Sequence, residues 1–404
     1  MTKILNLYKQ AYGGLSEPAW MLAVVMLINR AGSMVLPFLS IYLTQSLKFE
    51  IRETGIVLAS YGLGAMAGSL LGGWLSDRIG NFLVQFLSLV LGGIFFLFLP
   101  LITEFEWLTV AVFLVSMTVE SLRPANTASI ASYSKPENLT RSYSLNRMAI
   151  NLGFSIGPAL GGILASHSYE LLFYADGLTC ISAGIFFFVY FRNKTPRKVK
   201  EVPHASKALK DKSPYLDYSF LLFVLLVAGY AMVFFQLFNT IPIFYRESHH
   251  LSEGTIGILL GLNGLIVFLF EMILVHHFEK RVTIRKMIVI GTFLCGVSYA
   301  VLNVAGSISL LIAAVILLSF AEIMAMPFMV THVINKAGKG NQGSYIGLYS
   351  LAWASAFTLA PFLGTRVVAG AGFDILWWSC TGMSILLSLL FYFSLRKKVK
   401  RAQS

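Results

Sequence analysis

Long apolar runs alternate with short polar gaps along almost the whole chain. The runs lie at about 18–44, 56–75, 83–102, 107–133, 142–166, 171–191, 218–244, 254–275, 287–303, 307–333, 344–369 and 373–395. Each run is close to or longer than the roughly 20 residues that a helix needs to cross a bilayer. Backbone polar groups in lipid must be paired within their own segment, so we expect twelve membrane-spanning helices. The pattern predicts an all-α integral membrane protein.

Basic residues in the gaps indicate how these helices are oriented. Of the 31 Lys and Arg residues, 25 lie at the termini or in and beside the even-numbered gaps, whereas three lie in odd-numbered gaps (Lys48, Arg52 and Arg246). Positive charge collects on the cytoplasmic side of membrane proteins. An even number of spans puts both termini on one side. We therefore expect a multi-pass protein of the cytoplasmic (inner) membrane with both termini in the cytoplasm.

The composition narrows the classes of partner. Hydrophobic residues make up 56% of the chain and charged residues 12%, about half the charged share of a soluble protein. The net charge of +12 does not indicate nucleic acid, because the basic residues lie in the gaps. Cys180, Cys295 and Cys380 lie inside apolar runs, without the spacing of a metal site or a disulfide. We expect no metal, no cofactor and no nucleic-acid partner.

A single long polar stretch, residues 192–217, divides the spans six and six. It carries eight basic residues, and we expect a cytoplasmic linker that also contacts anionic headgroups of membrane lipid. The predicted domains are therefore an N-terminal six-helix half at 1–191, this basic linker, and a C-terminal six-helix half at 218–404.

The two halves resemble repeats of each other. Three matches recur at offsets of 202 or 203 residues: Glu120 with Glu322, Pro158 with Pro361, and Asp77-Arg78 with Glu279-Lys280. Repeats with a binding site between them near the bilayer midplane are what alternating-access carriers require.

A short motif joins the second and third spans. Its sequence is Gly73-Trp-Leu-Ser-Asp77-Arg78-Ile-Gly80, and the glycines allow a tight reversal. This G-x-L-x-D-R-x-G pattern resembles the signature loop of the major facilitator superfamily of transporters, although Asn81 and Phe82 replace two basic residues that usually follow. The resemblance covers essentially the whole chain.

The resemblance implies the major facilitator fold, in which twelve transmembrane helices form two pseudo-symmetric six-helix halves. It also implies that Gly73, Asp77, Arg78 and Gly80 form a cytoplasmic gate, a charged latch that holds the cytoplasmic side closed. The alternative for this loop is a topological anchor and helix cap. We expect the chain to act as a monomer.

A second motif lies in the fifth span, where Gly153, Gly157, Pro158, Gly161 and Gly162 recur at close spacing. Glycines four residues apart let helices approach closely, and proline frees a carbonyl group and bends the helix. The motif resembles the antiporter-like motif of proton-driven exporters in the superfamily. That resemblance implies an element between the halves that biases the direction of transport. Generic close packing is the alternative.

Charged residues within the spans are the strongest candidates for chemistry. We select Arg30, Glu120, Arg123, Glu271 and Glu322 among them. A charge at the bilayer centre costs at least about 2.5–3.5 kcal/mol, so each should face a partner or a cavity. Glu120 and Arg123 are three residues apart and can pair on one helical face. The superfamily places spans 1 and 4 side by side, so we expect Arg30 to share Glu120. A purely structural ion-pair network is the alternative.

Glu322 and Glu271 have no basic residue at helical spacing within their own spans. Burial disfavours the charged form of an isolated carboxyl group, so we expect both to bind protons. Glu322 is the first candidate for proton coupling, because Glu120 occupies the equivalent position in the other repeat. Glu120 is itself the third candidate for proton coupling. For Glu271 the alternative is access to cytoplasmic water.

Polar and aromatic residues of the same spans are candidates for lining a substrate cavity. With the charged residues they form the set Asn29, Arg30, Glu120, Arg123, Tyr230, Gln236, Asn239 and Glu322. Ordinary helix packing is the alternative for each aromatic or amide residue.

These features predict a secondary active transporter for a small organic solute, working by alternating access as a proton-coupled exporter. A proton-coupled peptide or other nutrient symporter is the rival. Arg30 followed by Tyr42-Leu43, and Glu322 five residues before Pro327, resemble parts of the oligopeptide transporter patterns. The glutamates expected before Arg30 are missing. A non-transporting receptor or an intramembrane enzyme is the alternative of another class, but no nucleophile or metal set lies near the midplane.

Overall fold

The computed structural model describes residues 14–135, 138–194, 214–279, 281–337 and 342–395. Most of the predicted basic linker, together with Lys280, lies outside these residues. Within them, eleven helical stretches are long and apolar enough to cross a membrane. The last, Ser344–Ser394, is broken at Gly372, whose φ of 86° and ψ of 174° are not helical, and it contains the last two predicted spans. The prediction of an all-α protein with twelve spans is confirmed.

Contacts divide the chain into two compact units. One contains Met1–His204 and Leu237–Phe268, and the other contains Ala205–Gln236 and Leu269–Ser404. The borders expected for the two six-helix halves stay a prediction.

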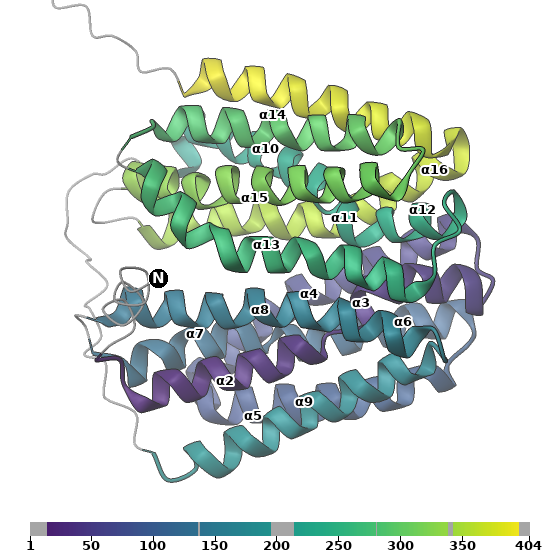
Figure 1. Ribbon diagram of the computed structural model, residues 1–404. Helices are drawn as coiled ribbons and strands as arrows, with labels where there is room; N and C mark the ends of the chain where they lie inside the picture. The colour runs from purple at the N-terminus through teal and green to yellow at the C-terminus, as the bar shows by residue number, and fades with distance from the viewer. Residues whose placement is uncertain (1–13, 136–137, 195–213, 280, 338–341, 396–404) are drawn as a thin grey trace, which may run out of the picture. The chain divides into compact units, whose positions relative to one another are not determined.

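The first unit begins with a spanning segment in three pieces (Figure 1). These pieces are α2 Glu17–Gly32, α3 Val35–Ile41 and the π-helix η1 Tyr42–Ser46. The other helices of the first unit are α4 Ile51–Ile79, α5 Asn81–Phe98, the 3-10 turn η2 Leu99–Leu101, α6 Phe105–Glu120, α7 Leu122–Tyr133, α8 Leu139–Ala165, α9 Glu170–Phe191, α12 Ile241–Glu247 and the first part of α13 Glu253–Glu279. The short α11 (Gln236–Asn239) begins at the border of the units. Helix α2 packs against α8 and α9, α4 against α6, and α5 against α9.

Span 1 breaks just after Arg30. Ser33 has φ −70° and ψ 76°, and the Met34 N–H donates to the Gly32 carbonyl over 2.7 Å. This geometry is an inverse γ-turn, which interrupts the helical hydrogen-bond ladder. The helix therefore breaks at Ser33, and the span continues as α3.

Span 4 breaks at its own charged residues. Helix α6 ends at Glu120 and α7 starts at Leu122. Pro124 has no N–H to donate to the Glu120 carbonyl four residues earlier, so the helix loses a bond at this point. The hydroxyl of Ser121 instead donates to the Met117 carbonyl over 2.8 Å and to the Gly68 carbonyl over 2.9 Å.

Glycines bring α4 against the helix that carries Glu120. An added Cβ on Gly64 would lie 2.9 Å from the Cβ of Ser116, and one on Gly72 would lie 2.7 Å from the Cα of Ser121. The Ser116 hydroxyl donates to the Tyr61 carbonyl over 2.6 Å. The approach is so close that α4 and the end of α6 pack backbone against backbone.

The second unit contains the remaining helices. They are the 3-10 turn η4 Pro214–Leu216, α10 Tyr218–Phe234, the second part of α13, α14 Ile284–Asn303, α15 Ile308–Ala337 and α16 Gln342–Ser394. Helix α14 packs against α15 and α16, and α10 packs against α16.

Asp217 joins three helices at one end of this unit. It is the N-cap of α10 and accepts from the Phe220 N–H over 3.1 Å. Its carboxylate also pairs with Lys336 near the end of α15 over 3.2 Å and accepts from the Tyr345 hydroxyl of α16 over 3.4 Å. One carboxylate thus ties together α10, α15 and α16.

Candidate functional site

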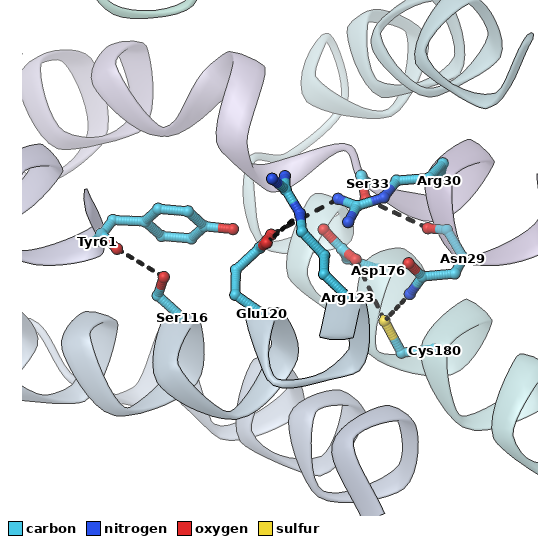
Figure 2. A network of polar contacts seen from close by, with 9 residues as sticks. All are labelled: Asn29, Arg30, Ser33, Tyr61, Ser116, Glu120, Arg123, Asp176 and Cys180. Atoms are coloured by element: carbon cyan, nitrogen blue, oxygen red, sulfur yellow. Dashed lines mark hydrogen bonds and ion pairs between the residues drawn. The ribbon is translucent and has the colours of Figure 1, made fainter. Parts of the chain in front are cut away.

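Glu120 lies at the centre of a buried charged network in the first unit (Figure 2). Its side chain is 5% exposed and forms ion pairs with Arg30 and Arg123. The Arg30 Nη1 atom lies 3.7 Å from Glu120 Oε1, and Arg123 Nε contacts Oε2 closely. Both pairs predicted from the sequence are confirmed. The role of these residues in transport stays a prediction.

The two guanidinium groups differ in environment. The Arg30 side chain is 6% exposed, whereas that of Arg123 is 60% exposed. Arg30 also lies over the Phe154 ring of α8, 5.5 Å from its centroid, and its Nε atom has no hydrogen-bond partner among the described residues. Arg30 is therefore a buried cation with unused donor capacity, and Arg123 is the solvent-facing member of the network.

The glycine motif of the fifth span packs against this site. An added Cβ on Gly153 would lie 2.5 Å from the Cβ of Arg30, and one on Gly157 would lie 3.0 Å from the Ser33 carbonyl oxygen. On its other side, an added Cβ on Gly162 would lie 3.0 Å from the Cα of Gly257 in α13. The motif lets α8 fit between the break in span 1 and the first part of α13.

Asp176 and Cys180 of α9 extend the network. Asp176 is 3% exposed, and its Oδ2 accepts from the Val35 N–H over 3.3 Å. The Cys180 thiol donates to Asp176 Oδ1 over 3.7 Å, and Asn29 Nδ2 donates to the Cys180 sulfur over 3.2 Å. The Asn29 side chain is thus held by α9 beside Arg30, and its part in a substrate cavity stays a prediction.

Asp176 is not among the residues predicted from the sequence to bind protons or line the cavity, although the signal was available. It is a carboxylate inside a predicted span, and the rule that selected Arg30 and Glu120 applies equally to it. Tyr61 of α4 also lies beside this network. Its ring lies within electrostatic reach of Glu120, Arg30 and Asp176.

The second unit holds other predicted residues. Glu322 of α15 is half-buried, takes part in a polar or electrostatic interaction, and lies within electrostatic reach of the buried Tyr230. Tyr230 packs edge-on against Trp353, with ring centroids 6.3 Å apart. Glu271 of α13 is half-buried and also has an interaction partner. The prediction that these two acids bind protons therefore no longer rests on a lack of partners. It rests on their position inside the spans.

The predicted amides are engaged in packing. Gln236 Nε2 donates to the Met232 and Ala360 carbonyls, each over 3.1 Å, which ties the end of α10 to α16. Asn239 is 3% exposed and has an interaction partner. Neither observation tests a part in substrate binding, which stays a prediction for both residues.

The predicted gate loop caps the end of α4. Asp77, Arg78 and Gly80 are exposed, and Gly73 is half-buried. Gly80 has φ 86°, a conformation that favours glycine, and separates α4 from α5. Arg78 lies over the Trp74 ring, 4.1 Å from its centroid. Among the residues described, no ion pair links Asp77 or Arg78 to another helix, and the latch role stays untested.

Comparison with known proteins identifies the family. The model of the Major Facilitator Superfamily matches residues 21–361 and 280–404. The chain belongs to the major facilitator superfamily. It is therefore a multi-pass membrane transporter and not an enzyme, and the buried network at the broken spans belongs to a carrier.

Relatives in this superfamily include antiport and efflux proteins. The chain is 26% identical over 366 residues to a "Na(+), Li(+), K(+)/H(+) antiporter" of Planococcus maritimus, covering 83% of this chain and 85% of the relative. It is 24% identical over 354 residues to the "Quinolone resistance protein NorA" of Staphylococcus aureus, covering 87% of this chain and 88% of the relative.

Solved structures share the superfamily fold. A POT family transporter in complex with a thioalcohol-conjugated peptide superposes with a TM-score of 0.78, covering 95% of this chain and 97% of that protein. The two sequences are 16% identical, so this likeness concerns the fold alone.

Proposed function

We propose that this carrier is a proton-coupled exporter of a small organic solute, working by alternating access in the cytoplasmic membrane. The observation that carries the proposal is the network of Arg30, Glu120 and Arg123 at the points where spans 1 and 4 are broken. Carriers build their substrate and ion sites from discontinuous helices, whose exposed backbone groups and inward-facing side chains supply the ligands.

The charges of this network depend on protonation. Glu120 faces two guanidinium groups, so the three side chains together carry one positive charge when all are ionised. A proton on Glu120 would leave the buried Arg30 and the exposed Arg123 without an anion between them, and like charges repel. Proton binding and the arrangement of Arg30 and Arg123 are therefore coupled in this proposal.

Glu322 and Glu271 are the proposed proton-binding acids of the other unit. Both are half-buried carboxyl groups in spanning helices. Glu322 interacts with Tyr230, which we propose as a cavity residue together with Asn29, Gln236 and Asn239.

The direction of transport is proposed from two supporting observations. The relatives include a protein named for quinolone resistance and one named as a cation/proton antiporter. The glycine motif of α8 seals closely against α13 as well as against span 1, as expected for an element that limits leak between the two sides. Both termini are proposed to face the cytoplasm, and the chain is proposed to act as a monomer.

The test is transport in everted membrane vesicles, with ethidium and dialanine as probes. With an acid interior, the proposal expects ethidium to accumulate inside as protons leave, and a collapsed pH gradient to abolish accumulation. Vesicles without the protein are the control. Uptake of dialanine into right-side-out vesicles driven by external acid, with no ethidium transport, would replace the exporter with the peptide symporter.

A further inference from the structure

The buried carboxylate of Asp176 has no assigned role in the proposed cycle. It lies on α9 directly beside the break in span 1, and Figure 2 shows it with Cys180 and Asn29 next to Arg30. Gly32, the last residue of α2, faces Thr179, and an added Cβ would lie 2.5 Å from the Thr179 Cβ. The backbone of the break therefore packs directly on the turn of α9 that carries Asp176.

Asp176 is connected to both pieces of span 1. Its Oδ2 accepts from the Val35 N–H at the start of α3. Its Oδ1 accepts from the Cys180 thiol, whose sulfur accepts from Asn29 of α2. A single carboxylate thus bridges the inverse γ-turn at Ser33 through direct bonds from the backbone and one bond relayed by the thiol.

The hydrogen-bond donors around Asp176 stabilise an ionised carboxylate only weakly. An ionised carboxylate offers about four lone-pair sites. Here the hydrogen-bond donors are the backbone N–H groups of Val35, at 3.3 Å, and Met34, together with the Cys180 thiol at 3.7 Å, and no ion pair involves Asp176 among the residues described. A buried carboxylate with so few strong donors is more stable in its neutral, protonated form.

The charged and titratable groups that face Asp176 are few. Arg30 of α2 acts on it electrostatically without forming an ion pair, Cys180 lies on its own helix, and Tyr61 of α4 is within electrostatic reach. Helices α3 and α5 contain no titratable residue. Arg147, the nearest such residue of α8, lies about 15 Å along that helix from Gly157.

We propose that Asp176 is a proton-binding residue of the transport cycle, and that its protonation loosens the break in span 1 that positions Arg30. Ionised, the carboxylate holds α3 through a charge-assisted bond to Val35 and competes with Glu120 for Arg30. Protonated, it is a weaker acceptor, so Val35 is released and Arg30 is left to Glu120. This inference rests on the proposed proton-coupled function and adds the residue that links proton binding to helix movement.

The test uses the infrared spectrum of the full-length protein in lipid bilayers, with the proton as the only ligand. The S–H stretching band of a thiol reports the strength of its acceptor. Cys180→Ala assigns the Cys180 band among the three free cysteines. Between about pH 5 and about pH 9, the wild-type band should shift as Asp176 changes from acid to carboxylate. Asp176→Asn should abolish the shift, and Glu322→Gln should preserve it.

Two results would overturn the inference: a wild-type Cys180 band that stays fixed over this range, or a shift that persists in Asp176→Asn. The first needs only wild-type and Cys180→Ala protein, so it decides even if Asp176→Asn does not fold. Ethidium accumulation measured on the same preparations separates the two proposals. If the Cys180 band shifts with pH but ethidium is not transported, the proposed function is wrong and this inference about protonation of Asp176 is not. If ethidium is transported by the proton gradient but the Cys180 band stays fixed, this inference is wrong and the proposed function is not.

Discussion

Glu120 is the residue on which the charged network depends, because it is the anion shared by Arg30 and Arg123. Removing one member of a buried ion pair leaves an uncompensated charge, which costs about 3–5 kcal/mol. We expect Arg30→Ala and Glu120→Ala each to lower the thermal unfolding midpoint of the purified protein. The double mutant should recover part of the loss, with a coupling energy of about 0.5–3 kcal/mol.

The matched control is the same double-mutant cycle carried out on Arg246 and Glu253. Their ion pair is 3.4 Å long, and the Arg246 side chain is 35% exposed. A pair open to solvent contributes about 1 kcal/mol or less. Strictly additive losses for Arg30 and Glu120 would show that these two residues do not interact, and the proposed site would lose its main support.

Asp217 provides a prediction about pH. Burial acts to raise its pKa, but hydrogen bonds from Ser219 and Phe220 and the charge of Lys336 outweigh this and hold the pKa below its usual value of 3.8. The ionised form is thus favoured by folding. Its stabilising effect is fully present above the pKa of the unfolded chain and is lost as the pH falls through the lower folded pKa.

Asp217→Asn keeps an N-cap acceptor but removes the charge that pairs with Lys336, so it should cost about 0.2–1 kcal/mol at neutral pH. The difference from wild type should shrink below about pH 4. The control is Asp374→Asn, which removes the same charge from an exposed position. An equal loss of stability in both variants would mean that the contacts of Asp217 with α10, α15 and α16 contribute nothing beyond the effect of net charge.

At the scale of elements, the close fit of α8 against span 1 makes Gly153 a sensitive position. An added methyl group would overlap the Cβ of Arg30, so α8 or α2 must move. Overpacking of this kind costs about 1–3 kcal/mol. We expect Gly153→Ala to lower stability and to weaken ethidium transport, because the shift displaces Arg30. Gly382→Ala is the control, since its added methyl group meets no atom within 4 Å.

The sequence predicted the spans well and the breaks poorly. Hydrophobic length alone predicts a spanning helix, and no predicted run extends more than one residue beyond an observed helical stretch. The break at Ser33 had a signal in the sequence, because Pro37 cannot donate to the Ser33 carbonyl four residues before it. The break at Ser121 also had a signal, Pro124, because a proline cannot donate to the carbonyl four residues before it.

The site was predicted where charges can be paired by helical spacing or by the order of spans that the superfamily implies. Glu120 and Arg123 lie three residues apart on span 4, and their contact follows from helix geometry. Asp176 pairs with no charge on its own helix, and apart from Cys180, one turn further along that helix, its partners are backbone N–H groups of span 1. Such partners depend on how helices pack and cannot be read from one span.

At the scale of the whole molecule, the loop between α4 and α5 is proposed to hold the cytoplasmic side closed. Asp77→Asn should then increase the labelling of single-cysteine probes placed in the cytoplasmic half of the spans. The variant Glu106→Gln, which neutralises an exposed carboxylate elsewhere, should leave labelling unchanged. Unaltered labelling with normal transport in Asp77→Asn would reduce the loop to a helix cap.

The central claim is that protons drive transport through buried carboxyl groups. The most direct measurement compares ethidium accumulation with ethidium exchange in everted vesicles carrying wild-type or Glu322→Gln protein. The account predicts that Glu322→Gln still exchanges labelled for unlabelled ethidium but no longer accumulates it when the interior is acid. Accumulation at the wild-type level in this variant would contradict the account.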